Sequence, residues 1–160
     1  MEIKLFSGEM VKIDEEDYEI IKNYKWRLNK TKKYKYAVAY KLKSKNKTVV
    51  MHRLIMKATK RQMIDHINGD GLDNRKLNLR FCNKSLNAAN SCLHRDNKSG
   101  YKGVHWSNRD KKWYSQITLN YKQRLIGLYD NKDDAACAYD KVAQELFGKF
   151  ARINFSLNTV

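Results

Sequence analysis

The sequence lacks proline and paired cysteines, and both absences limit what the protein can be. With no proline in 160 residues, its turns depend on glycine, asparagine and aspartate. Its three cysteines, Cys82, Cys92 and Cys137, include no CxxC pair, which argues against a zinc ribbon. An odd cysteine count without a secretory leader indicates reduced thiols in an intracellular protein. Cys137 lies in an apolar helical pattern and is predicted to be in the core.

Acidic residues are missing from a long basic segment. Between Ile20 and Ile64 there are 15 lysines and arginines and no aspartate or glutamate, and the whole chain has a formal net charge of +16. Such like-charge repulsion favours a polyanionic partner, and nucleic acid is the leading candidate. The sequence also has no apolar run long enough to cross a membrane and no secretory apolar segment at its start. We therefore expect an intracellular protein that binds nucleic acid.

The first 92 residues are predicted to form small sheets and short helices. Alternation of apolar and polar residues predicts strands near residues 3–5, 11–13, 36–40, 48–50, 63–67 and 77–82, with a lysine-rich turn after residue 40. Short helices are predicted over 15–25, with Asp14 as N-cap, over 54–60, and from Asn83 or Ser85 to about Cys92. Residues 68–74, which are rich in Gly, Asn and Asp, predict a loop between the last two strands.

The remaining residues predict a second architecture. Residues 93–99 are polar and resemble a linker, and strands are predicted over 103–106, 113–119 and 124–129. A helix is predicted from Asn131 to Phe147, ended by Gly148. Its apolar face is expected to consist of residues at helical spacing: Ala135, Ala138, Tyr139, Val142 and Leu146. The fold class is therefore predicted to be α+β, in two domains.

Asp65 and His66 have the chemistry that phosphodiester hydrolysis needs. The reaction requires a base that takes a proton from water and a divalent cation that neutralises charge on the phosphate. An imidazole works as a base near neutral pH, and a carboxylate is a good ligand for a hard cation. Asn83, Asn87 and Asn90 share one face of the predicted helix, so an amide oxygen is available as a second ligand. Because neighbouring side chains on a strand point to opposite faces, a strand end or bulge is needed here.

Three segments of the first domain resemble HNH endonucleases of the phage and intron-encoded homing type: MHRLIM (51–56), IDHINGDGLDNRKLNLR (64–80) and SLNAAN (85–90). The resemblance implies a ββα-metal module over about residues 63–92, preceded by a small sheet. It implies that His66 is the general base, that Asp65 and Asn87 are metal ligands and that Asn78 braces the loop. Asn90 is the rival ligand to Asn87. Amide oxygen in place of imidazole favours Mg²⁺ or Mn²⁺ over zinc.

Three cations around this module are predicted to contact DNA. His52 and Arg53 recur in the HNH setting, where either packing or phosphate contact explains them, and we favour phosphate or support of the site. Arg80, at the end of the second strand, is expected to hold a phosphate near the metal.

The second domain resembles the AP2 DNA-binding domain over nearly all of residues 100–155, through YKGVHW (101–106), KKWYSQI (111–117), IGLYDNKDDAACAYDKVAQELFG (126–148) and ARINF (151–155). The family fold is a three-stranded antiparallel sheet backed by one helix, with the sheet in the DNA major groove. The positions that this implies for groove contacts are Lys102, His105, Ser107, Arg109, Gln116 and Thr118. Arg124 is expected to hold a phosphate, and Trp106 either stacks on a sugar or packs at the sheet edge. Several positions that are arginine in plant members are Lys, His, Ser or Thr here, which weakens a bidentate grip on guanine.

These observations predict a metal-dependent DNA endonuclease of the HNH homing type, with residues 1–92 as nuclease domain, 93–99 as linker and 100–160 as DNA-binding domain. We expect it to act on double-stranded DNA in a bacterial host, to be phage-encoded, to use Mg²⁺ or Mn²⁺, and to nick as a monomer or cut both strands as a dimer. The alternatives are a DNA-binding regulator with a silent nuclease module, and an RNA-binding or structural basic protein. Intact Asp65, His66, Asn78 and Asn87 argue against a silent module.

Overall fold

The computed structural model describes residues 1–31, 34–40 and 48–155 and confirms an α+β fold with small antiparallel sheets. The chain divides into two compact units, Met1–Asn83 and Lys84–Val160, which are considered separately below. No helix in the described ranges is long and apolar enough to span a membrane. The lysine-rich turn predicted after residue 40 falls on residues 41–47, outside those that are described.

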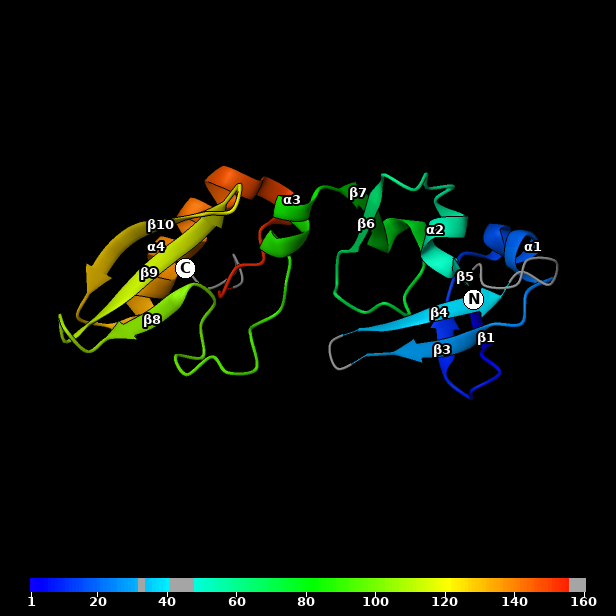
Figure 1. Cartoon of the computed structure of the whole chain (residues 1–160), viewed down its shortest axis with the longest axis horizontal. Coiled ribbons are helices and arrows are strands. Elements are labelled where there is room, and N and C mark those ends of the chain that lie inside the picture. Colours follow the sequence, from blue (N-terminus) through cyan, green and yellow to red (C-terminus); the bar gives the residue numbers. More distant parts are fainter. Residues whose placement is uncertain (32–33, 41–47, 156–160) are drawn as a thin grey trace. The chain divides into compact units, whose positions relative to one another are not determined.

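The first unit is built from short antiparallel strands (Figure 1). The strands pair as β1 with β2, as β3–β4–β5 and as the hairpin β6 with β7; their bounds are Glu2–Lys4, Met10–Lys12, Arg27–Lys30, Lys35–Tyr40, Thr48–Val50, Met63–His66 and Leu79–Cys82. Its helical segments are η1 (Glu15–Asp17), α1 (Tyr18–Ile21), α2 (Met51–Ile55) and η2 (Lys76–Asn78). Val11, Ile13, Ile21 and Met51 are fully buried in one core, so burial of alternate apolar residues holds the strands in register.

Several predicted boundaries in this unit were wrong. The helix predicted over 54–60 is α2, which starts at Met51, and the helix predicted to reach residue 25 ends at Ile21. Asp14 occupies the N-cap position but makes no side-chain cap hydrogen bond. Its carboxylate accepts a hydrogen bond from the distant Lys76 backbone N–H (2.7 Å) instead. At Asp14 a distant tertiary contact thus takes the place of the local cap.

The second unit is a three-stranded sheet with one long helix against it (Figure 1). The sheet order is β10–β9–β8, from Val104–Ser107 (β8), Lys112–Leu119 (β9) and Lys122–Tyr129 (β10). The long helix α4 (Lys132–Phe147) begins after Asn131, whose side chain accepts the Asp133 N–H (2.9 Å), and ends at Gly148 with φ +50°. The unit also contains α3 (Lys84–Ala89) and η3 (Gly148–Phe150).

The buried face of α4 differs from the predicted one. Ala135, Ala136, Tyr139, Ala143 and Phe147 are buried against the sheet, whereas Leu146 is exposed. The prediction that Cys137 is in the core was wrong, because it points to the exposed side of this helix. The small alanines allow α4 to lie close to β9.

Helix α3 belongs to the second unit, although the predicted domain boundary placed it in the first. Ala89 at its end is buried in the same cluster as Ile117, Tyr139 and Phe147. The Arg152 N–H also donates to the Ala89 carbonyl (3.2 Å). The contacts therefore divide the chain between Asn83 and Lys84, ahead of the predicted linker at 93–99.

Candidate active site

Asp65 and His66 are the last two residues of β6, where the hairpin opens into the 67–78 loop. The pairing of β6 with β7 places Asp65 opposite Arg80 and His66 opposite Leu79. Both Asp65 and His66 are 6% exposed. Two ionisable side chains so deeply buried at a strand end are costly to keep, which is typical of a functional site.

Arg80 binds Asp65 directly across the hairpin. Its Nε and Nη2 donate to the same carboxylate oxygen, Oδ2, at 2.9 and 2.7 Å, and both side chains are largely buried. The guanidinium was predicted to hold a phosphate, and the structure places it against Asp65. Its contact with a phosphate remains a prediction.

The imidazole of His66 lies among aromatic rings. Its centroid is 4.8 Å from that of His52 and 5.8 Å from that of Tyr36, and its Nε2 is 3.4 Å from Asn74 Oδ1. Burial lowers the pKa of His66, against the opposing effects of the Asn74 contact and of nearby carboxylates, chiefly Asp65. A histidine whose pKa lies below its ordinary value is neutral at pH 7 and can accept a proton.

His52 and Arg53, predicted to contact DNA, both make contacts inside the first unit. His52 is buried, and burial, followed by the effects of His66 and Arg53, lowers its pKa to about 3. Arg53 donates to the carbonyls of Gln62 (2.8 Å) and Thr59 and so holds the segment after α2. His52 therefore packs beside His66. Contact of His52 or Arg53 with DNA remains a prediction.

The 67–78 loop is held by side-chain amides. Asn78 Nδ2 donates to the Asp73 carbonyl (2.8 Å) and to Asn68 Oδ1 (3.0 Å), and its Oδ1 accepts the Asn68 N–H (3.0 Å). Asp73 in turn binds Arg75 through two hydrogen bonds of 2.8 and 2.7 Å. Asn78 therefore ties the two ends of the loop together next to His66.

Gly71 lets this loop approach β4. A Cβ added there would lie 2.1 Å from the Lys35 carbonyl and 2.7 Å from the Tyr36 ring, so any other residue would force the two apart. Tyr36 contacts His52 and His66 and was not among the predicted site residues. Asn74 was missed as well: it is fully buried, and its Nδ2 has no hydrogen-bond partner among the described residues. The Gly-Asp-Asn composition signals a loop, but it does not show which of its amides turns inward.

The residues around Asp65 fit a hard divalent cation. Within the described ranges no three His, Cys, Asp or Glu side chains are arranged to hold a metal ion. Magnesium commonly takes one or two protein carboxylates and fills its remaining positions with water and substrate phosphates. The Asp65 carboxylate suits such a site. Asn87 lies half-buried on α3 and Asn90 just beyond it, both in the second unit, so a role as ligand remains a prediction for either.

In the second unit, the structure places Lys102 away from the face predicted to read DNA. Its ammonium donates to the carbonyls of Ser91 (2.9 Å) and Ala89, at the end of α3. Burial lowers the pKa of Lys102 to about 8. This lysine therefore closes the C-terminal end of α3, a position where a cation offsets unpaired carbonyls.

Two further predicted DNA contacts lie near the β8–β9 turn. The Ser107 hydroxyl donates to Asp110 (2.7 Å), and the exposed Arg109 donates to the same carboxylate (3.0 Å). Trp106 packs edge-on against Trp113, with ring centroids 5.2 Å apart, and is 44% exposed. These contacts agree with packing of Trp106 at the sheet edge.

The remaining predicted contacts divide between the two faces of the sheet. His105, Gln116 and Thr118 alternate with the buried Val104, Ser115 and Ile117 and so lie on the face away from α4. Arg124 pairs with Ile117, which places it on the other face, where it is exposed. Arg124 is therefore separated from the predicted reading face.

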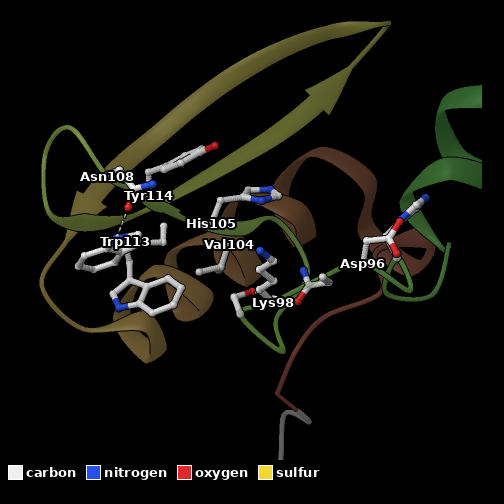
Figure 2. Close-up of a pocket in the computed structure, with 11 residues that line it drawn as sticks. Asp96, Lys98, Val104, His105, Asn108, Trp113 and Tyr114 are labelled. Carbon is white, nitrogen blue, oxygen red and sulfur yellow. Dashed lines mark hydrogen bonds and ion pairs between the residues drawn. The ribbon is translucent and has the colours of Figure 1, made fainter.

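A hollow beside the first two strands is lined by the 94–99 segment and by residues of β8 and β9. Figure 2 shows His105 and Tyr114 at this hollow together with Asp96 and Lys98. The rings of His105 and Tyr114 are stacked with centroids 5.3 Å apart, and burial lowers the pKa of His105. The exposed sheet face therefore carries a neutral imidazole at this position at pH 7.

Comparisons with known proteins add two viral relatives. Protein 3.8 of Escherichia phage T7 is 35% identical over 89 residues, which cover 56% of this chain and 73% of the phage protein. An uncharacterized HNH endonuclease of Acanthamoeba polyphaga mimivirus is 29% identical over 137 residues, which cover 84% of this chain and 69% of the viral protein. No family model and no solved structure matches the chain.

Proposed function

The chain belongs to the family of Protein 3.8 of Escherichia phage T7, and we propose that it is a metal-dependent HNH endonuclease that hydrolyses phosphodiester bonds in DNA. The similarity to a mimivirus HNH endonuclease over most of the chain supports this proposal, and both relatives are viral, which supports a phage origin. The observation that carries it is the buried His66, neutral at pH 7, beside Asp65 on a hairpin whose loop is held by Asn78.

In this proposal His66 acts as the general base. Its lowered pKa leaves the imidazole unprotonated at pH 7, so it accepts the proton of the attacking water. Tyr36 and His52 pack against its ring and fix its orientation. The fully buried Asn74 contacts His66 through its Oδ1 and so helps to hold the imidazole in place.

Asp65 is the proposed carboxylate ligand, with Asn87 as the predicted amide ligand. A bound divalent cation supplies charge neutralisation at the scissile phosphate and the leaving oxygen. Arg80, whose Nη2 lies 2.7 Å from Asp65 Oδ2, holds this carboxylate in place and adds a second positive charge beside it for the phosphate oxygens. Arg80 therefore binds Asp65 in the free protein, and we expect it to contact a phosphate when DNA is bound.

We propose that the second unit, with its AP2-like sheet and helix, binds duplex DNA and so directs cutting. A monomer has one His66 site and nicks a single strand; a dimer on DNA cuts both. The basic segment from Ile20 to Ile64 supplies sequence-independent affinity for phosphates.

The decisive experiment compares two histidine variants on supercoiled plasmid with Mg²⁺. His66→Ala is expected to cut at least about 100-fold more slowly than the wild type, which is the lower range for a general base. His94→Ala is the matched control, because this side chain is 81% exposed and lies outside the hairpin. The His94→Ala variant should cut at the wild-type rate. EDTA should stop cutting by the wild type and by His94→Ala.

Two outcomes would contradict the proposal: cutting that persists in His66→Ala, or cutting that needs no metal. Tight DNA binding by the wild type without any cutting would favour the regulator instead. Conversion to open circles alone indicates nicking, whereas early linear product indicates a dimer.

A further inference from the structure

The sheet of the second unit has one face that α4 does not cover, and the 94–99 segment borders this face at His105 and Tyr114. Helix α4 packs on the face that carries Val104, Ser115 and Ile117, all of them buried. Alternation along β9 places Tyr114, Gln116 and Thr118 on the opposite face, where they are half-buried or exposed. We call this opposite side the open face.

A β-bulge in β10 adds two leucines to the open face. Leu125 pairs with Gln116 and Leu128 pairs with Tyr114, although a spacing of three residues on a regular strand would place them on opposite faces. The register shifts between Leu125 and Gly127, so one extra residue in β10 turns both leucines to the same side. Leu125 is 65% exposed and Leu128 is 47% exposed. Two exposed leucines on one face form a larger apolar surface than single scattered leucines, and such a surface is typical of a binding site.

The open face carries little charge, while cations surround it. His105 is neutral at pH 7 because burial lowers its pKa, and Lys112 is paired with Asp130 (3.1 Å). Exposed cations lie at the turns beside it: Lys111 and the Asp110-paired Arg109 between β8 and β9, and Lys122 at the start of β10. A neutral centre within a basic rim is complementary to the base edges of a DNA groove between two phosphate backbones.

The base edges in the major groove distinguish the possible contacts. Guanine is read best by a bidentate arginine or lysine; the open-face positions of β8, β9 and β10 hold no arginine, and their one lysine, Lys112, is paired with Asp130. Adenine is read by the amide of glutamine or asparagine, and thymine presents a methyl group that apolar side chains contact. Gln116 and Leu125 are direct cross-strand neighbours, so an amide and an isobutyl group are presented side by side.

We propose that the open face reads A·T base pairs in the major groove, with Leu125 and Leu128 against thymine methyl groups and Gln116 on adenine. This inference rests on the proposed function, because it takes DNA as the ligand. It adds the class of sequence that the second unit selects and two readout residues, Leu125 and Leu128, that the sequence motifs do not identify.

The test uses the full-length protein in EDTA, so that binding is measured without cutting. A random duplex pool is selected for binding to the wild type, and the selected duplex is then prepared with deoxyuridine in place of thymidine, which removes only the C5 methyl groups. The selected sites should be rich in A·T pairs. Each methyl contact that is lost should weaken binding about fourfold, as expected for about 0.8 kcal/mol per buried methyl-sized group.

Variants then assign the methyl contact to the open face. The double variant Leu125→Ala, Leu128→Ala should bind the thymidine duplex as weakly as the wild type binds the uracil duplex, and it should no longer distinguish the two; Leu125→Ala alone should lose part of this preference. Leu146→Ala is the matched control, since this leucine is exposed on α4; it should retain the full thymidine preference. Thermal unfolding of each variant checks that the fold is kept.

Selected sites rich in G·C pairs, or equal binding to both duplexes, would overturn the proposal. So would unchanged DNA binding by Leu125→Ala, which would indicate that the open face meets a protein instead. These results are independent of the plasmid assay: a metal-dependent nuclease without methyl preference refutes only this inference, whereas methyl preference without cutting refutes only the nuclease.

Discussion

The two units differ in what they bury and what they expose. The first unit buries ionisable and amide side chains around its hairpin, including His52, Asp65, His66 and Asn78. The second unit buries mainly apolar side chains, with many alanines and aromatics, between α4 and its sheet, together with one carboxylate, Asp140, and it exposes two leucines on the opposite face. Burying ionisable groups is costly, whereas exposing leucines gives up burial energy. Each unit thus departs from a simple apolar core where its proposed function requires it.

The difference separates reaction chemistry from recognition. In the first unit burial lowers the pKa of the His66 imidazole, and Arg80 binds the neighbouring Asp65 carboxylate. The second unit presents side chains with little ability to titrate, which suits contact with base edges. If this separation holds, a substitution in one unit should change only the property assigned to that unit. The expected effects are given from the largest to the smallest.

The largest contrast is expected between Asn78→Ala and Asn154→Ala. Each side chain makes three hydrogen bonds within its own unit: Asn78 to Asn68 and Asp73, Asn154 to Lys102 and Asp140. Both variants should lose about 3 kcal/mol of unfolding free energy, at about 1 kcal/mol per bond, in urea titrations. Asn78→Ala should also cut plasmid at least roughly tenfold more slowly, because the loop beside His66 loosens.

Asn154→Ala should weaken DNA binding and leave the cutting rate at saturating protein close to the wild-type rate. Equal loss of cutting in both variants would show that cutting and DNA binding are not separated between the two units.

A smaller contrast is expected in acid. The pKa of His52 is about 3 in the folded protein, below its ordinary value of about 6.5, so the unfolded chain binds the extra proton between these limits. The stability of the first unit should therefore be complete above pH 6.5 and should fall by up to about 1.4 kcal/mol between pH 6 and pH 5. Trp26 belongs to the first unit, so its fluorescence in a Trp106→Phe, Trp113→Phe background follows this transition.

His52→Phe should flatten this pH dependence. An acid profile as steep as that of the parent would show that His52 is not the group responsible.

The smallest contrast concerns thiols. Cys137 is exposed on α4, so Cys137→Ser should change the unfolding free energy by no more than about 0.5 kcal/mol. Burial raises the pKa of Cys82 to about 11, so this thiol should react with iodoacetamide more slowly at pH 8 than Cys137 does. Mass spectrometry of each alkylated site measures the rates, and faster labelling of Cys82 would contradict its burial on β7.

The sequence predicted most strands and the long helix because their signals are local. Alternating apolar residues mark the strands, and Asn131 and Gly148 are typical helix ends, which the structure confirms for α4. Asp65, His66 and Asn78 were identified by resemblance, and the structure brings Asp65 and His66 together on one hairpin with Asn78 bracing its loop.

Other features depend on contacts that the sequence does not display. Lys102 and Arg80 have long side chains whose partners are a helix end and a neighbouring strand, and composition cannot distinguish these from phosphates. Leu125 and Leu128 share a face only because of a bulge, which shifts the strand period of two. Asn74 and Tyr36 became site candidates only once the loop was placed against β4.

The packing of α3 has a consequence for exchanging recognition between proteins. The segment that folds as one body begins at Lys84, because Ala89 is buried with Ile117 and Tyr139 and Lys102 closes the end of the helix. A chimera joined at the polar 93–99 segment would place a foreign helix against this sheet, and the burial of Ala89 with Ile117 and Tyr139 would be lost. Junctions placed at Asn83 would transplant the module whole, with the packing of α3 against the sheet and α4 kept.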